Sequence, residues 1–304
     1  MSSEPGMPAN SKTFSASSSR DAMRAACDIA GLPSGNADLM RLGENALFHL
    51  SEAGVVVRIA RSMDYWDDAV KEVNVSQWLA HHSFPAAETF EISQPIEVSD
   101  HPVTFWKYLV GRPGDTRDIA DLGTTLRALH GTPVPTDFKL PPKEVLGRVR
   151  PRIEKSPIPA ADRKFLLNHV DELQSELPRL RYKMPQAPTH GDAHVKNLMI
   201  VDNNPVLIDF ERFAWGQPEW DLAVTATEYR TAHWWTDEQY KRFVAAYGYD
   251  VTSWDGFDTL RAVNELTMTT WLMQNVGESS DIADEYQVRM RTLRGEQSPG
   301  WRAF

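Results

Sequence analysis

The feature that most constrains the fold is a predicted β-hairpin inside an otherwise helical stretch. Two short apolar runs, Leu198–Val201 and Val206–Ile208, are separated by the sequence Asp-Asn-Asn-Pro at residues 202–205. Turn residues between two apolar runs are typical of a hairpin. The chain from Glu219 onward follows helical spacing instead. The chain is therefore expected to be an α+β protein rather than a simple helical bundle.

Three oxygen-bearing side chains are expected to meet at the mouth of this hairpin. If residues 203 and 204 form a two-residue turn, Asn197 lies opposite Phe210 and Asp209 lies opposite Leu198. Asp192 precedes the hairpin in a tight loop. Oxygen ligands at this density suit Mg²⁺, which binds through few protein groups and keeps its other positions for phosphate and water.

The rest of the sequence predicts two lobes after an N-terminal tail. Residues 1–20 are rich in Ser, Pro and Gly and are expected to be a disordered tail. Residues 21–109 alternate short apolar strands with turns and include a helix over 66–81, which predicts a small antiparallel sheet lobe. Residues 110–304 predict a larger, mainly helical lobe.

Composition argues against several classes of protein. No apolar run approaches the roughly 20 residues that a membrane-spanning helix needs, and the N-terminus lacks a secretory pattern. A single cysteine, Cys27, cannot form an internal disulfide, and a net charge of −10 disfavours binding to nucleic acid. We expect a cytoplasmic monomer or homodimer that binds neither nucleic acid nor membrane.

The loop before the hairpin carries the strongest motif. Residues 190–197 read H-G-D-x-H-x-x-N, and residues 208–211 read I-D-F-E. The pattern resembles the catalytic centre of the aminoglycoside phosphotransferase and choline kinase family, relatives of the protein kinases. The resemblance implies a bilobal protein-kinase-like fold, Mg²⁺ as cofactor and ATP as cosubstrate.

The resemblance also implies roles for individual residues of the motif. A hydroxyl is a poor nucleophile, so Asp192 would be the catalytic carboxylate that orients it and accepts its proton. Asn197 and Asp209 would hold Mg²⁺, which neutralises charge on the transferred phosphoryl group. His190 and His194 are expected to be supporting residues.

The nucleotide is expected to contact the sheet lobe. The turn at 43–46 occupies the place of the family's phosphate-covering loop but is not a G-x-G-x-x-G sequence. Arg58 stands where the family has a lysine, and arginine can also bind phosphates in bidentate fashion. Glu72 matches the glutamate that pairs with this cation, and backbone groups at the end of the fifth strand would bind adenine. The expected nucleotide-binding residues are Gly43, Glu44, Asn45, Arg58, Glu72, Lys107 and Leu109.

The acceptor side is expected to be acidic. Residues 186–288 carry 17 acidic and 6 basic side chains. A solvated acidic surface is one interpretation, and a carboxylate-lined cleft for a cationic substrate is the other. Residues 211–222 resemble the family's E-x-x-x-x-G-x-P-x-x-D-L segment, in which Asp221 is a supporting residue. The expected substrate-binding residues are Glu211, Glu219, Glu228 and Glu265.

The main hypothesis is an ATP- and Mg²⁺-dependent phosphotransferase that moves the γ-phosphate to a hydroxyl of a small, amino-bearing molecule of the aminoglycoside type. The first alternative is a kinase for an amino sugar or another metabolite, such as choline, homoserine or a sugar. A second alternative is a catalytically silent, kinase-like binding protein, suggested by Arg58 and the irregular glycine turn. A third is a metal-dependent hydrolase with His190, Asp192 and His194 as ligands.

Overall fold

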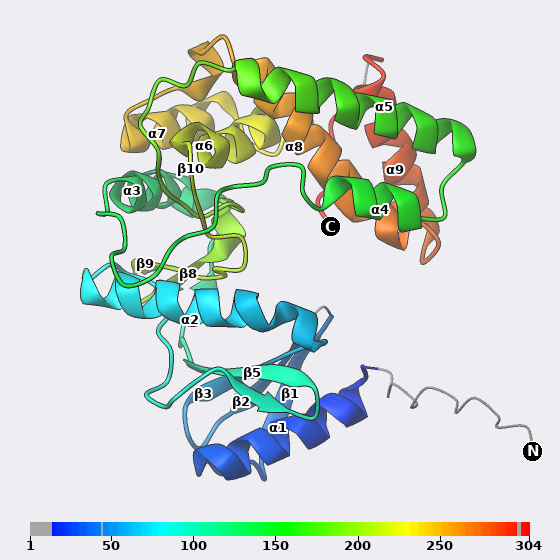
Figure 1. Ribbon diagram of the computed structural model, residues 1–304. Helices are drawn as coiled ribbons and strands as arrows, with labels where there is room; N and C mark the ends of the chain where they lie inside the picture. The colour runs from blue at the N-terminus through cyan, green and yellow to red at the C-terminus, as the bar shows by residue number, and fades with distance from the viewer. Residues whose placement is uncertain (1–13, 44, 297–298) are drawn as a thin grey trace, which may run out of the picture. The chain divides into compact units, whose positions relative to one another are not determined.

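The computed structural model describes residues 14–43, 45–296 and 299–304. The chain divides into two compact units, with the boundary between Val110 and Gly111 (Figure 1). Each unit has its own hydrophobic core. In the described residues, no helix is both long enough and apolar enough to cross a membrane.

The first unit is built on a five-stranded antiparallel sheet with the strand order β1-β2-β3-β5-β4. Alternate side chains of the central strands, such as Val55, Val57 and Ile59, are fully buried, as the period of two along a strand requires. They pack with the helix α1 (Ala16–Ala30) into one core. The strands are β1 (Ala37–Leu42), β2 (Asn45–Leu50), β3 (Val55–Ala60), β4 (Ile96–Val98) and β5 (His101–Lys107).

Two helices accompany this sheet, α1 (Ala16–Ala30) and α2 (Trp66–His81). The bounds of α2 are those expected from the sequence. Helix α1 begins inside the expected tail, because Ser15 forms a capping box with Ser18 that satisfies the first backbone N–H groups. The tail prediction is therefore wrong for residues 16–20, and residues 1–13 lie outside the described residues.

The second unit is mainly helical, as expected. Helices α4, α5, α8 and α9 share one apolar core, and α3 packs against α7. The helices are α3 (Ile119–His130), α4 (Val149–Lys155), α5 (Ala160–Glu176), α6 (Pro218–Thr227), α7 (Asp237–Tyr247), α8 (Phe257–Leu272) and α9 (Ser280–Leu293). A π-helical turn, Glu228–Ala232, continues α6.

Two small sheets lie within the second unit. One has the order β6-β8-β9, and the other pairs β7 with β10. Their strands are β6 (Arg112–Pro113), β7 (Ala187–Thr189), β8 (Leu198–Val201), β9 (Asn204–Leu207) and β10 (Ala214–Gly216). The hairpin β8–β9 is the one expected from the sequence, and the loop between β7 and β8 carries the H-G-D motif.

The register of the hairpin differs from the expected one. Val201 pairs with Asn204, so the turn consists of residues 202 and 203, both with positive φ. The reason is Pro205: in the expected register it would have to supply the N–H that closes the turn, and proline has none. In the observed register Pro205 stands where no N–H is needed, and Leu198 no longer faces Asp209.

Candidate active site

The loop between β7 and β8 is held by hydrogen bonds to a buried carboxylate. Asp221, in the first turn of α6, accepts the backbone N–H groups of His190 and Gly191 at 2.7 and 2.8 Å. His130 contacts the same carboxylate at 3.1 Å. Burial alone would raise the pKa of Asp221, but the hydrogen bond and charge of His130 hold it below its ordinary value. The anchor therefore stays ionised.

The imidazole of His190 links this loop to the end of β9. Its Nε2 lies 2.9 Å from the Ile208 carbonyl, and its Nδ1 accepts the backbone N–H of Asp192 at 3.3 Å. These partners assign the proton to Nε2. Both ring nitrogens are committed to backbone groups, so His190 supports the loop. This argues against the hydrolase alternative, in which His190 would bind a metal.

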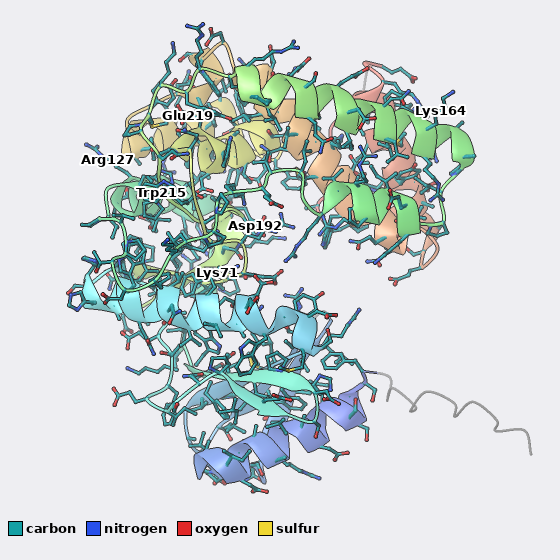
Figure 2. All side chains as sticks on the ribbon, in the orientation of Figure 1. Lys71, Arg127, Lys164, Asp192, Trp215 and Glu219 are labelled. Atoms are coloured by element: carbon teal, nitrogen blue, oxygen red, sulfur yellow. The ribbon has the colours of Figure 1, made fainter. Side chains whose placement is uncertain are left out.

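Asp192 projects from this loop with 42% of its side chain exposed (Figure 2). The carboxylate lies 3.8 Å from Nε2 of His194. Partial burial alone would raise the pKa of Asp192, but the positive charge of Arg212, with that of His194 when its ring is protonated, holds it below its ordinary value. Burial conversely lowers the pKa of His194. The site thus presents an accessible, ionised carboxylate.

Asn197 and Asp209 are brought together at the open end of the hairpin. The N–H of Ile208 donates to the Asn197 carbonyl at 3.0 Å, and Asp209 follows with a φ of 67°. The Asn197 amide nitrogen donates to the Asp192 carbonyl at 2.8 Å. This fixes the amide and makes its oxygen the atom able to bind a cation. Within the described part of the chain, no group of three or more His, Cys, Asp and Glu side chains is arranged to hold a metal.

Three of the expected nucleotide-binding residues meet in the first unit. Arg58 on β3 forms an ion pair with Glu72 on α2, whose side chain is 5% exposed. When the Asn45 amide is oriented with its oxygen toward Arg58, that oxygen accepts hydrogen bonds from Nη2 and Nε of Arg58 at 2.9 and 3.3 Å. The carbonyl of Gly43 accepts a hydrogen bond from Arg61 at 3.2 Å. Glu44 lies outside the described residues.

Lys107, at the end of β5, already forms two contacts with Glu88. The backbone N–H of Lys107 donates to the Glu88 carbonyl at 2.9 Å, and its ammonium contacts the Glu88 carboxylate at 2.5 Å. The N–H of Lys107 is therefore not available to adenine. Leu109, which follows, is half-buried.

The four expected substrate-binding carboxylates have different surroundings. Glu219 is fully buried and accepts the N–H groups of Lys183 and Met184 at 2.7 and 2.9 Å. It anchors the segment before β7, away from Asp192 (Figure 2), so the expected substrate contact at Glu219 is corrected. Glu211 forms an ion pair with Arg148 at 2.5 Å.

Glu228 and Glu265 are the other two expected substrate-binding carboxylates. Glu228 opens the π-helical turn and accepts the indole N–H of Trp235 at 2.8 Å. Burial, with the nearby charge of Asp192, raises the pKa of Glu228 to about 7. Glu265 on α8 accepts the hydroxyl of Thr231 at 2.5 Å, and burial raises its pKa. The effect of the Asp192 charge on the pKa of Glu228 places these two carboxyl groups within electrostatic range of each other.

Lys143 is part of the site and was not expected from the sequence. Its ammonium donates to the Gly191 carbonyl at 2.8 Å. Lys143 lies in a proline-rich loop 48 residues before Gly191, and no motif marks it. Arg212 was also missed, although its position directly after the I-D-F-E segment, beside Glu211, could have indicated it.

One of the comparisons with known proteins shows the family. No curated protein sequence matches the chain. A family model described as "Phosphotransferase enzyme family" matches residues 42–262, which is more than half of the chain.

Solved structures of low sequence identity share the fold. The amicoumacin kinase hAmiN, solved with AMP-PNP and Ca²⁺, has a TM-score of 0.73 at 16% identity, over 93% of this chain and 97% of that one. The choline kinase LicA from Streptococcus pneumoniae gives 0.65 at 15%, over 91% and 99%. An aminoglycoside phosphotransferase from Streptomyces rimosus gives 0.56 at 17%, over 83% and 98%. The expected α+β, kinase-like fold is confirmed, and the chain belongs to the phosphotransferase enzyme family.

Proposed function

We propose that this enzyme is a small-molecule kinase that transfers the γ-phosphoryl group of ATP to a hydroxyl of an amino-bearing molecule. The observation that carries the proposal is the arrangement around Asp192. Its carboxylate is ionised and accessible, and its loop is fixed by Asp221, His190 and Asn197. A carboxylate held in this way can orient a hydroxyl and accept its proton as the new bond to phosphorus forms.

The residues at the hairpin mouth fit a magnesium ion. The Asn197 amide oxygen and the Asp209 carboxylate are a sparse set of hard oxygen donors, which Mg²⁺ accepts because phosphate and water complete its coordination. When bound, the ion neutralises charge on the phosphate oxygens. Arg58, held by Glu72 and Asn45, is proposed to bind nucleotide phosphates.

The acceptor is proposed to carry an amino group. Glu228 lies close enough to Asp192 for their charges to interact, and it belongs to a segment with a large excess of acidic residues. A cation on the acceptor would compensate the charge of this buried carboxylate. The similar structures are named as kinases of amicoumacin, choline and aminoglycosides, which supports the class without naming the molecule. A kinase for an amino sugar or another metabolite is the alternative within the same chemistry.

The test is a panel of amino alcohols, aminoglycosides and amino sugars incubated with MgATP, read as release of ADP. We expect turnover with at least one acceptor. Asp192→Asn should lower kcat by about 10³-fold or more, because it removes the group that accepts the proton. Asp202→Asn, in the exposed hairpin turn, is the matched control and should leave kcat unchanged. Turnover of Asp192→Asn within tenfold of the unmodified enzyme would contradict the role of Asp192.

A second outcome would identify the silent binding protein instead. In that case MgATP raises the melting temperature, Asp209→Ala abolishes the rise, and no acceptor yields ADP. Arg58 in the lysine position is the observation that motivates this alternative.

A further inference from the structure

Lys143 is placed by backbone hydrogen bonds between its loop and β10. Its N–H donates to the Trp215 carbonyl at 3.0 Å, and the Trp215 N–H donates to the Pro141 carbonyl at 2.8 Å. Pro142 and Trp215 form a short parallel bridge between these bonds. The proline-rich loop is therefore docked on β10, which fixes the point from which the Lys143 side chain starts.

Two glycines give this side chain its room. A Cβ at Gly216 would lie 2.9 Å from the Cβ of Lys143, and a Cβ at Gly191 would lie 2.3 Å from its ammonium nitrogen. Gly191 also has a φ of 82°, which residues with a side chain rarely adopt. The Arg212 carbonyl oxygen would lie 2.2 Å from a Cβ at Gly191, and the Trp220 ring would lie 2.6 Å from one at Gly216, so Lys143 is one of two neighbours that occupy the space at each glycine.

The two polar groups of Gly191 are held by opposite charges. Its N–H donates to the Asp221 carboxylate at 2.8 Å, and its carbonyl accepts the Lys143 ammonium at 2.8 Å. Hydrogen bonds with a charged partner are about twice as strong as neutral ones. Asp192 is the next residue, so the orientation of this peptide decides where its carboxylate points.

We propose that Lys143 is a positioning residue of the phosphotransfer reaction, which holds the Gly191 carbonyl and thereby presents the Asp192 carboxylate in one orientation. This inference rests on the proposed function. The positive charge of Lys143 also contributes to keeping the pKa values of Asp192 and Asp221 low. Misplacing a reacting group by about 1 Å costs roughly 100-fold in rate, so losing the contact between Lys143 and the Gly191 carbonyl should lower the rate of phosphotransfer measurably.

The experiment compares Lys143→Met with Lys139→Met, which removes an exposed lysine from the same loop. Lys143→Met should lower kcat by roughly 10- to 100-fold and change KM for ATP by less than about twofold. Lys143→Arg, which keeps the charge and the donor, should recover part of the loss. Lys139→Met should behave as the unmodified enzyme. If Lys143→Met does not fold, Lys143→Gln takes its place in each comparison.

A double-mutant cycle tests whether Lys143 acts through Asp192. In an Asp192→Asn background, Lys143→Met should lower the residual rate by less than about twofold, because the group it positions has been changed. A full 10- to 100-fold loss in that background would overturn the inference and place Lys143 on the transferred group itself. Normal kcat in Lys143→Met would also overturn it. An unmodified enzyme without turnover on any acceptor would instead contradict the proposed function.

Discussion

Two buried carboxylates of the second unit show how surroundings decide the charge of a residue. Asp221 accepts two backbone N–H groups and contacts His130, and its pKa is lowered. Glu228 accepts only one indole N–H, and burial, with the negative charge of Asp192, raises its pKa to about 7. The same chemical group is therefore a fixed anion in one place and a titrating group in the other.

The raised pKa of Glu228 predicts a dependence of stability on pH. The folded pKa of about 7 exceeds the ordinary value of 4.5, so the folded chain holds this proton more tightly than the unfolded chain does. The protonated Glu228 carboxyl makes its full contribution to the unfolding free energy below about pH 4.5, and this contribution is lost as the pH rises through about 7. The groups that face the carboxyl are Asp192, which raises the pKa, and Lys196 and Trp235, which lower it.

Glu228→Gln should remove this loss. Its melting temperature should exceed that of the unmodified protein above pH 7 and approach it near pH 5, with a difference of up to about 3 kcal/mol in unfolding free energy. Thermal unfolding across this pH range measures the difference. The exposed Glu238→Gln on α7 serves as the control. A difference in melting temperature between Glu228→Gln and the unmodified protein that is the same at all pH values would contradict the raised pKa of Glu228.

Among the elements, α2 and the strands β2, β3 and β8 could be read from the sequence because apolar periodicity and turn residues are local signals. The register of β8–β9 depended on one residue, Pro205, whose missing N–H moves the turn. The contact of Lys143 with Gly191 and the burial of Glu219 could not be predicted. Each depends on how distant segments pack, and a carboxylate on a buried helix face looks in sequence like one on a solvated face.

Helix α9 carries a buried ion pair that ties the last residues of the chain to it. Glu285 and Arg289 pair at 2.9 Å with side chains 1% and 3% exposed. Arg289 also donates to the carbonyls of Met268 and Arg302 and lies over the ring of Trp301. The ion pair thus joins α8, α9 and residues 301–302.

Glu285→Ala should destabilise the protein by about 3–5 kcal/mol, because it leaves the guanidinium of Arg289 buried without its carboxylate. Asp284→Ala changes the exposed neighbour on the same helix and should cost less than about 0.5 kcal/mol. Urea unfolding of the two variants measures the difference. Equal costs would mean that the ion pair contributes no more than a surface charge.

At the scale of the whole molecule, negative charge is unevenly distributed along the chain. Residues 186–288 hold 17 acidic against 6 basic side chains, whereas the whole protein has a net charge of −10. An acidic segment around the proposed acceptor site attracts cations through a field that salt screens, with a Debye length of about 10 Å at 0.1 M.

Raising the salt concentration from about 0.05 to 0.5 M should therefore increase KM for a cationic acceptor several-fold. KM for ATP should change less, and a neutral acceptor of similar size provides the comparison. Steady-state kinetics at both concentrations check this. An equal change for neutral and cationic acceptors would mean that the acidic segment does not take part in capture.

The π-helical turn Glu228–Ala232 makes the path of the chain after α6 sensitive to the deletion of one residue. A π turn closes i to i+5 hydrogen bonds, one residue more than an α-helix. Deleting a single residue within it would restore the α-helical phase and move the point at which the chain leaves the helix by about 100° around the helix axis. Trp235 would then leave Glu228 while the carboxylate itself stayed in place. A change in chain length, with no substitution at all, would thus change the surroundings of the carboxyl that is proposed to face the acceptor.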